Sequence, residues 1–131
     1  MLEKINLDKV LFLDIETVPQ QYKYVDLDVK TKELFDAKTR FMQSEEKEYT
    51  DIYNERAGIY AEFGKIICIS VGLVTETRTG KQMRLKSFYH DDEETLLKQF
   101  IGLLNNNYNT QYHILCGHNA KEFDFPYIAR R

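Results

Sequence analysis

The sequence lacks any long apolar run: no stretch of its 131 residues approaches the 18 that a membrane-spanning helix needs. The first ten residues, MLEKINLDKV, are too charged for a secretory signal peptide. The chain also lacks an excess of basic residues, because its formal net charge is -3. Bulk charge therefore gives no indication of a nucleic-acid partner, although a site that holds divalent cations must itself be acidic. We expect a cytoplasmic protein with no membrane partner.

Cysteine is scarce as well. Cys68 and Cys116 each stand inside an apolar run, with no partner at the spacing of a metal site. Free cysteines are among the most often buried residues, so we expect both to be small core residues in a reducing compartment. No internal repeat or low-complexity tract is present. The composition, 43% hydrophobic and 30% charged, is typical of one folded domain with a substantial core.

Three segments have the pattern of strands. Residues 8–14 form a short apolar run, and residues 65–74 are rich in β-branched side chains, with Gly72 indicating a bulge or close packing. Residues 83–89 alternate apolar and polar side chains, as a half-exposed strand does. The turn composition of residues 75–82 predicts that the last two strands form an antiparallel hairpin.

A helix and a further strand are predicted after the hairpin. Asp91 is a good N-cap with Glu94 three positions later, so the acids of DDEE are interpreted as helix capping. The helix TLLKQFIGLLNN follows, with an apolar face formed by Leu97, Phe100, Ile101 and Leu104. Residues 113–117 then predict a short buried strand. A last helix is predicted to start near Asn119 or Phe123, because Pro126 is tolerated only in a first turn.

The segment 20–63 is rich in Lys, Glu and Tyr, and predicts two amphipathic helices, the second starting near Ser44. Their apolar clusters are Leu34, Phe35, Ala37, Phe41 and Met42 in one, and Tyr49, Ile52, Tyr53 and Tyr60 in the other. We interpret the tyrosines as a packing face, not a base-stacking platform. The segment is interpreted as a helical insertion in a single domain of residues 1–131. The order of elements predicts a mixed α/β sheet.

Two acids follow the first apolar run in VLFLDIET. Residues two apart in a strand point to the same face, so Asp14 and Glu16 project together at, or just past, the expected strand end. Two such charges repel unless a cation joins them. Carboxylates fit the hard cations Mg²⁺ and Mn²⁺, although a solvated strand end stays possible.

A second acid-bearing stretch, GHNAKEFDFPYIAR, follows the short strand at 113–117 and places Asp124 near a helix start. Asn119 or Asp124 could be no more than an N-cap there. Together, however, the two stretches resemble the motifs of the DEDD (DnaQ-like) 3′–5′ exonuclease superfamily, closest to the exonuclease domain of family B DNA polymerases and its stand-alone relatives. FLDIET matches the first motif, GHNAKEFDFPYIARR the second, and EFGKIICIS the second strand of the stand-alone relatives.

This resemblance implies a ribonuclease H-like fold: three antiparallel strands extended by parallel ones, with helices packed on the sheet. It implies that Asp14, Glu16 and Asp124 are catalytic and bind two Mg²⁺ or Mn²⁺ ions. It further implies that Thr17, Asn119 and Phe123 contact or position the substrate. The expected activity is hydrolysis of phosphodiester bonds at the 3′ end of nucleic acid, single-stranded DNA in the polymerase-like branch.

The third motif of that superfamily, Tyr or His followed by three residues and Asp, is missing after Asp124. The match Tyr22-x-x-x-Asp26 lies directly after the first motif, which is the wrong place. We therefore expect a truncated domain, incomplete at its C-terminus, with impaired activity alone. Two alternatives stay open. One is an inactive ribonuclease H-like module for nucleic-acid binding or protein interaction. The other is a haloacid dehalogenase-like phosphatase with Asp14 as nucleophile, in which Glu16 replaces the usual second Asp.

Overall fold

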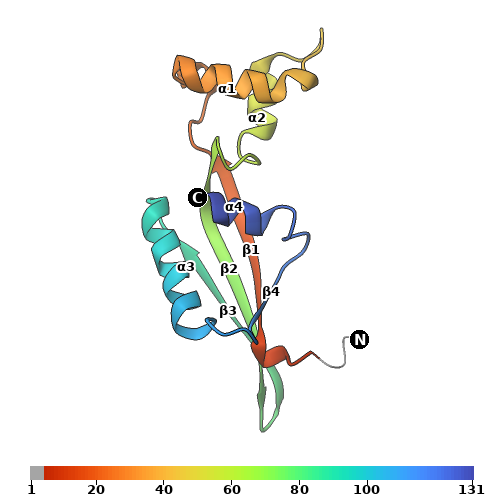
Figure 1. The fold of residues 1–131 in the computed structure, drawn as a ribbon, viewed down its shortest axis with the longest axis vertical. Helices are drawn as coiled ribbons and strands as arrows, with labels where there is room; N and C mark the ends of the chain where they lie inside the picture. The colour runs from red at the N-terminus through yellow and green to blue at the C-terminus, as the bar shows by residue number, and fades with distance from the viewer. Residues whose placement is uncertain (1–4) are drawn as a thin grey trace. The chain divides into compact units, whose positions relative to one another are not determined.

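The computed structural model describes residues 5–131 and shows an α/β protein built on one mixed sheet of four strands (Figure 1). The strands are β1 (Val10–Pro19), β2 (Gly64–Thr77), β3 (Gly80–Tyr89) and β4 (Ile114–Cys116), in the order β3-β2-β1-β4. β1 and β4 are parallel, and the other neighbours are antiparallel. The helices are α1 (Val29–Thr39), α2 (Tyr49–Arg56), α3 (Glu93–Asn107) and α4 (Asp124–Arg130), with 3-10 turns at Leu7–Lys9, Tyr24–Asp26 and Arg40–Met42. The predicted mixed α/β sheet is confirmed at this coarse level.

By its internal contacts the chain divides into two compact units, with boundaries inside β1 and β2. Among the described residues, the sheet unit comprises 5–16 and 66–129, and the helical unit comprises 17–65 and 130–131. The two predicted helices of segment 20–63 are present in the helical unit, as α1 and α2.

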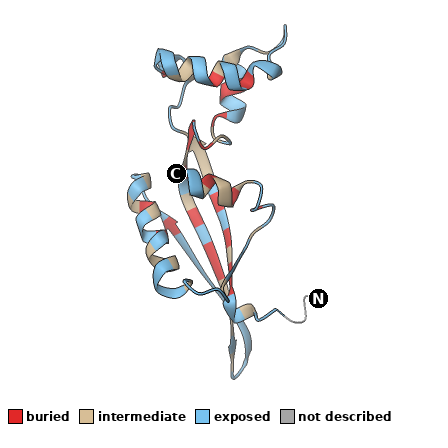
Figure 2. Cartoon of the chain, viewed as in Figure 1, coloured by how far each residue is buried: buried red, intermediate tan, exposed pale blue. Residues whose placement is uncertain are grey.

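Strand β1 is longer than predicted, so Asp14 and Glu16 lie within it. The strand was expected to end at residue 14, but it continues to Pro19. Buried and exposed residues alternate along it, as the pleat requires, and Figure 2 shows this alternation as bands of colour. Asp14 and Glu16 are therefore in the body of a strand, not at its end. The charged residues predicted the end of the strand, but they occupy exposed positions within it.

One face of the sheet is packed against α3. The hairpin register pairs Ile69 with Phe88 across β2 and β3, and both side chains are buried. The Phe88 ring meets that of Phe100 of α3 edge to face, with centroids 6.0 Å apart. Leu96 of α3 is also fully buried, while Ile101, expected on the buried face, is exposed.

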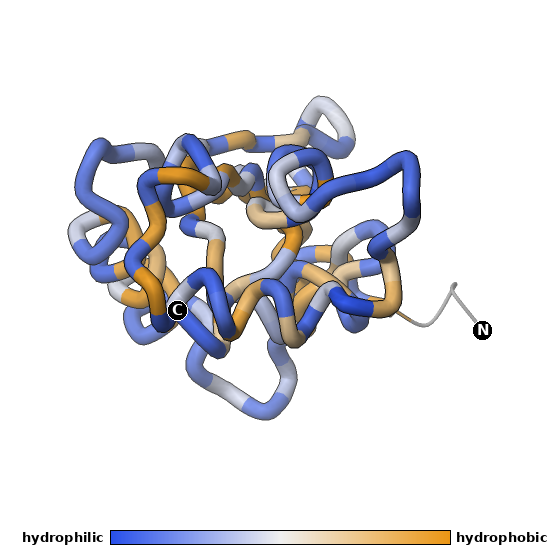
Figure 3. The backbone as a smooth tube through the Cα atoms, turned by 90° about the horizontal axis from the view of Figure 1, so that it is seen from above, coloured by the Kyte–Doolittle hydropathy of each residue, from blue (hydrophilic) through white to orange (hydrophobic). Residues whose placement is uncertain are grey.

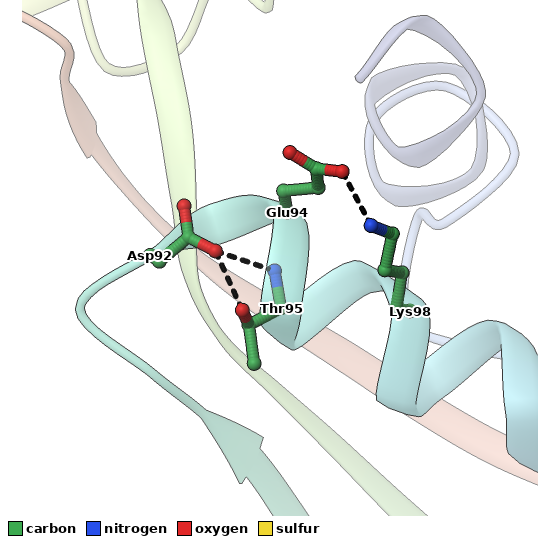
Figure 4. A network of polar contacts seen from close by, with 4 residues as sticks. All are labelled: Asp92, Glu94, Thr95 and Lys98. Atoms are coloured by element: carbon green, nitrogen blue, oxygen red, sulfur yellow. Dashed lines mark hydrogen bonds and ion pairs between the residues drawn. The ribbon is translucent and has the colours of Figure 1, made fainter.

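The start of α3 lies one residue later than predicted. Asp92, not Asp91, is the N-cap, and its carboxylate accepts hydrogen bonds from the backbone N–H of Thr95 (2.9 Å) and from its hydroxyl (2.6 Å) (Figure 4). These bonds lower the pKa of Asp92. Glu94 pairs with Lys98 one turn on. Helix capping by this acidic stretch is thus confirmed for Asp92, whereas Glu93 accepts a hydrogen bond of 2.7 Å from the backbone N–H of Ile66.

Close packing explains Gly72. A Cβ at Gly72 would stand 2.7 Å from the methyl carbon of Met83, so the side chains of β3 lie across it.

The prediction that β4 and the two cysteines are buried was wrong. All three residues of β4 are exposed, Cys116 among them, and Cys68 is half-buried. β4 is an edge strand in the described part of the chain, and its apolar sequence suggested a central one.

The helical unit has a core of its own. It is formed by Leu27, Phe35, Ile52, Tyr53, Ala57 and Phe63, with Tyr24, Met42, Tyr49 and Tyr60 packed against it. The Phe35 ring meets those of Tyr53 and Phe63 edge to face at 4.9 Å and 5.1 Å. The tyrosines are therefore a packing face, as predicted. The predicted start at Ser44 was wrong, because α2 is capped by Glu48, whose side chain and that of Asp51 form a reciprocal capping box.

The distribution of hydropathy follows this architecture. Figure 3 shows hydrophobic stretches interrupted by hydrophilic residues along the regular elements, and mostly hydrophilic connecting loops. Within residues 5–131, no helix combines the length and apolar character required to cross a bilayer.

Candidate active site

The candidate site is built on the middle of β1. Leu13 and Ile15 point into the packed side of the sheet and are buried, so the intervening Asp14 and the following Glu16 point to the other side and are exposed. At these exposed positions water can solvate both carboxylates. The strand thus presents two hard oxygen ligands on one face, as the sequence predicted.

Asp124 is brought to the same part of β1 from the other end of the chain. It is the first residue of α4, is 3% exposed, and its Oδ1 accepts a hydrogen bond of 3.1 Å from the backbone N–H of Ile15. The pairing of β1 with β4 ends at Phe12, so the Asp124 carboxylate takes up a backbone donor beyond the end of that ladder. Asp124 therefore contacts the backbone of β1 between Asp14 and Glu16.

A close approach of backbones holds this junction. A Cβ on Gly117, directly after β4, would lie 2.6 Å from the carbonyl oxygen of Leu13 and 2.7 Å from Cβ of Ala120. Only glycine fits there without displacing β1 or the following loop. Gly117 was not among the residues that the sequence singled out, although a glycine at the end of an apolar run was the available signal.

Asn119 and Phe123 shape the loop before α4. Asn119 has a left-handed backbone conformation (φ 53°), which asparagine adopts more readily than most residues. Its carbonyl accepts hydrogen bonds from the N–H groups of Glu122 (3.0 Å) and Phe123 (3.2 Å). The half-buried ring of Phe123 packs on that of Tyr127, with centroids 5.4 Å apart. Thr17 is half-buried in β1 and belongs to the helical unit.

An open cavity of about 550 Å³ adjoins Asp14 on the exposed face of the sheet. Its lining comprises Phe12, Leu13, Asp14, Ser70, Val71, Gly72, Met83, Leu85, Lys86, Ser87, Cys116, Gly117 and His118. The hydroxyls of Ser70 and Ser87 are hydrogen-bonded across the hairpin at 2.9 Å. The size is that of a small-molecule site, and the lining is mostly apolar with one carboxylate. His118 is a polar residue of this cavity that the sequence analysis did not select.

The fit of a divalent cation is mixed. Carboxylate oxygens are the ligands that Mg²⁺ and Mn²⁺ prefer, and Mg²⁺ often takes only one or two of them and keeps several waters. Asp14 and Glu16 provide two carboxylates of this type on one face of β1. Within the described range 5–131, however, no three Asp, Glu, His or Cys side chains are grouped closely enough to hold a metal ion together. Asp124, in particular, uses Oδ1 to bind the backbone of Ile15.

Comparison of the chain with protein-family models, with curated proteins and with solved structures found no match.

Proposed function

We propose that this chain carries the catalytic face of a metal-dependent 3′–5′ exonuclease of the DEDD type, acting on the 3′ ends of single-stranded DNA. The observation that supports it best is the hydrogen bond between Asp124 and Ile15, because it joins the acids of two motifs on one strand segment.

In this proposal Asp14 and Glu16 hold the first cation from the exposed face of β1. Asp124, bound to the backbone of Ile15 through Oδ1, would supply a further carboxylate oxygen. The chemistry that such ions supply is activation of a water and stabilisation of charge on the leaving 3′-oxygen. The apolar wall beside Asp14 excludes water from one side of the terminal nucleotide. Phe123 offers an aromatic surface that stacks on any base.

Mn²⁺ titration followed by calorimetry tests the metal site. We expect saturable binding that is lost in Asp14→Asn and Glu16→Gln, because each removes a charged ligand. Glu76→Gln is the matched control, since Glu76 is an exposed glutamate on β2 that lies outside the cavity. The same variants are then assayed for stepwise shortening of 5′-labelled single-stranded DNA in Mn²⁺. Equal Mn²⁺ affinity in the native chain and both site variants would contradict the proposal.

A second function is favoured by one observation: no set of three metal ligands is assembled within residues 5–131. The chain would then be an inactive ribonuclease H-like module in which Asp124 serves only to fasten α4 to β1. Asp124→Asn distinguishes the two, because asparagine keeps an oxygen acceptor for Ile15 but loses the charge. For the exonuclease we expect Asn to retain the fold and lose Mn²⁺ affinity. For the module it leaves both stability and ligand binding unchanged.

A further inference from the structure

A second cavity, of about 390 Å³, lies in the sheet unit; its lining does not include Asp14 and shares Val71, Leu85 and Lys86 with the first cavity. Its lining comprises Asp8, Lys9, Leu11, Val71, Leu73, Arg84, Leu85, Lys86, Leu103, Asn107, Tyr108 and His113. The apolar members come from β1, β2, β3 and α3. The volume falls within the range of about 300–1,000 Å³ that small-molecule sites occupy.

Cations gather around this apolar floor. The hairpin register sets Arg84 opposite Leu73 and Lys86 opposite Val71, so both basic side chains emerge on the side of the sheet that forms the cavity. Lys9 adds a third positive charge, against the single acid Asp8. The ion pairs within residues 5–131 use Lys38, Lys47 and Lys98, and none involves these three cations. Lys86 Nζ lies over the Phe88 ring, 4.4 Å from its centroid. In a chain of net charge -3, this is a local positive surface.

The end of the cavity near α3 is aromatic and donates hydrogen bonds. The rings of Tyr108 and His113 lie 5.0 Å apart at 53°. The backbone N–H of Thr110 donates to Nδ1 of His113 at 3.3 Å, so Nδ1 is an acceptor and the neutral ring carries its proton on Nε2. Burial raises the pKa of Tyr108, which keeps its hydroxyl protonated as a donor. Asn107 adds an amide.

We propose that this cavity binds a nucleoside monophosphate, with its base on the apolar and aromatic wall and its phosphate against Arg84, Lys86 and Lys9. A wholly apolar ligand would desolvate these cations without compensation. A bare inorganic anion would leave the apolar floor in water. A ligand that joins a flat polar-edged ring to a phosphate satisfies both, and Asn107 suits the hydrogen-bonding edge of a base. The site is independent of the exonuclease proposal.

Titration with adenosine 5′-monophosphate in the presence of EDTA tests this, since the chelator removes any metal at Asp14. We expect saturable binding by calorimetry, with shifts of the His113 and Arg84 side-chain NMR signals. Arg84→Ala should weaken binding about tenfold or more, as loss of a hydrogen bond to a charged group does. Arg78→Ala is the matched control, because Arg78 lies in the turn of the same hairpin and outside the cavity. It should bind as the native chain does.

Two further ligands test whether both the base and the phosphate are required for binding. Adenosine without phosphate and inorganic phosphate without a base should each bind at least tenfold more weakly than the monophosphate. Lys9→Ala provides a second cation variant outside the hairpin, and far-UV circular dichroism checks that each variant is folded. The proposal is overturned if no saturable binding is seen, if Arg84→Ala and Lys9→Ala both bind like Arg78→Ala, or if phosphate alone binds as tightly as the nucleotide.

Discussion

The two units of the chain use their aromatic and charged residues in opposite ways. The helical unit closes around edge-to-face rings at Phe35, Tyr53 and Phe63, and its core is buried on every side. The sheet unit packs one face against α3 and leaves Asp14, Glu16 and a cavity on the other. Both units have buried cores, but the exposed carboxylates of β1 lie in the sheet unit. We therefore expect substitutions in the helical core to destabilise the protein, and substitutions on the exposed face of the sheet to change ligand binding.

The largest effect is expected from Phe35→Ala in the helical core. Phe35 is fully buried, so the change should lower the free energy of unfolding by about 3–5 kcal/mol. Phe41→Ala is the control, since Phe41 was predicted in the same cluster but is 81% exposed. It should stay within about 0.5 kcal/mol. Urea denaturation followed by circular dichroism measures both, and similar losses for the two would show that Phe41 is also a core residue.

An intermediate effect is expected from Gly117→Ala in the sheet unit. The added Cβ would press on the Leu13 carbonyl and force the loop before α4 away from β1, at a cost of about 1–3 kcal/mol. Gly102→Ala in α3 should instead stabilise the fold by about 0.5–1 kcal/mol, because its Cβ enters open space in a helix. Thermal melts compare the pair. A destabilised Gly102→Ala with a neutral Gly117→Ala would reverse the assignment of the tight contact.

The smallest effect depends on pH. The Tyr24 hydroxyl donates to the Asp36 carboxylate at 2.8 Å, and burial, followed by this bond and the Asp36 charge, raises the pKa of Tyr24 to about 12. Since the pKa is near 10 when the chain is unfolded, the stabilisation is complete below pH 10 and is lost between pH 10 and 12. Tyr24→Phe should cost about 1 kcal/mol at neutral pH and flatten this alkaline decline.

Urea titrations at several pH values measure it, with the exposed Tyr22 changed to Phe as the control. An alkaline decline of equal slope in Tyr24→Phe and in the native chain would place the titrating group elsewhere. The neutral range offers an internal check: Tyr24 carries no charge there, so the stability of Tyr24→Phe and that of the native chain should change in parallel with pH.

Local patterns predicted the fold where the deciding contacts are local. The β2–β3 hairpin, α3 and the pair α1 and α2 follow from alternation, capping and helical spacing in consecutive residues. The predictions that were wrong depend on a position in the sheet or on hydrogen bonds between particular side chains. HILCG reads as a buried strand, yet β4 is exposed because of its place at the edge of the sheet. Ser44 is a better N-cap than Glu48 by type, but the reciprocal bonds of Glu48 and Asp51 decide the start of α2.

For the candidate site, the sequence predicted which acids lie on one face of β1 but not how the second motif reaches them. The exposed side chains of Asp14 and Glu16 follow from the pleat alone. The bond from Asp124 to Ile15 and the need for glycine at 117 depend on the distance between two backbones remote in sequence. No periodicity encodes that distance. The cavity with Arg84 and His113 was missed for the same reason, since its residues come from five separate segments.

The bond between Asp124 and Ile15 also bears on the order of folding. It closes a loop of 109 residues, and the parallel pairing of β1 with β4 closes one nearly as long. Such closures carry an entropic cost that grows with loop length and are made late, after the hairpin and the helices have formed locally. We therefore expect Asp124 to reach Ile15 only in a late stage of folding. A chain arrested earlier would hold native helices and hairpin, and still have no site.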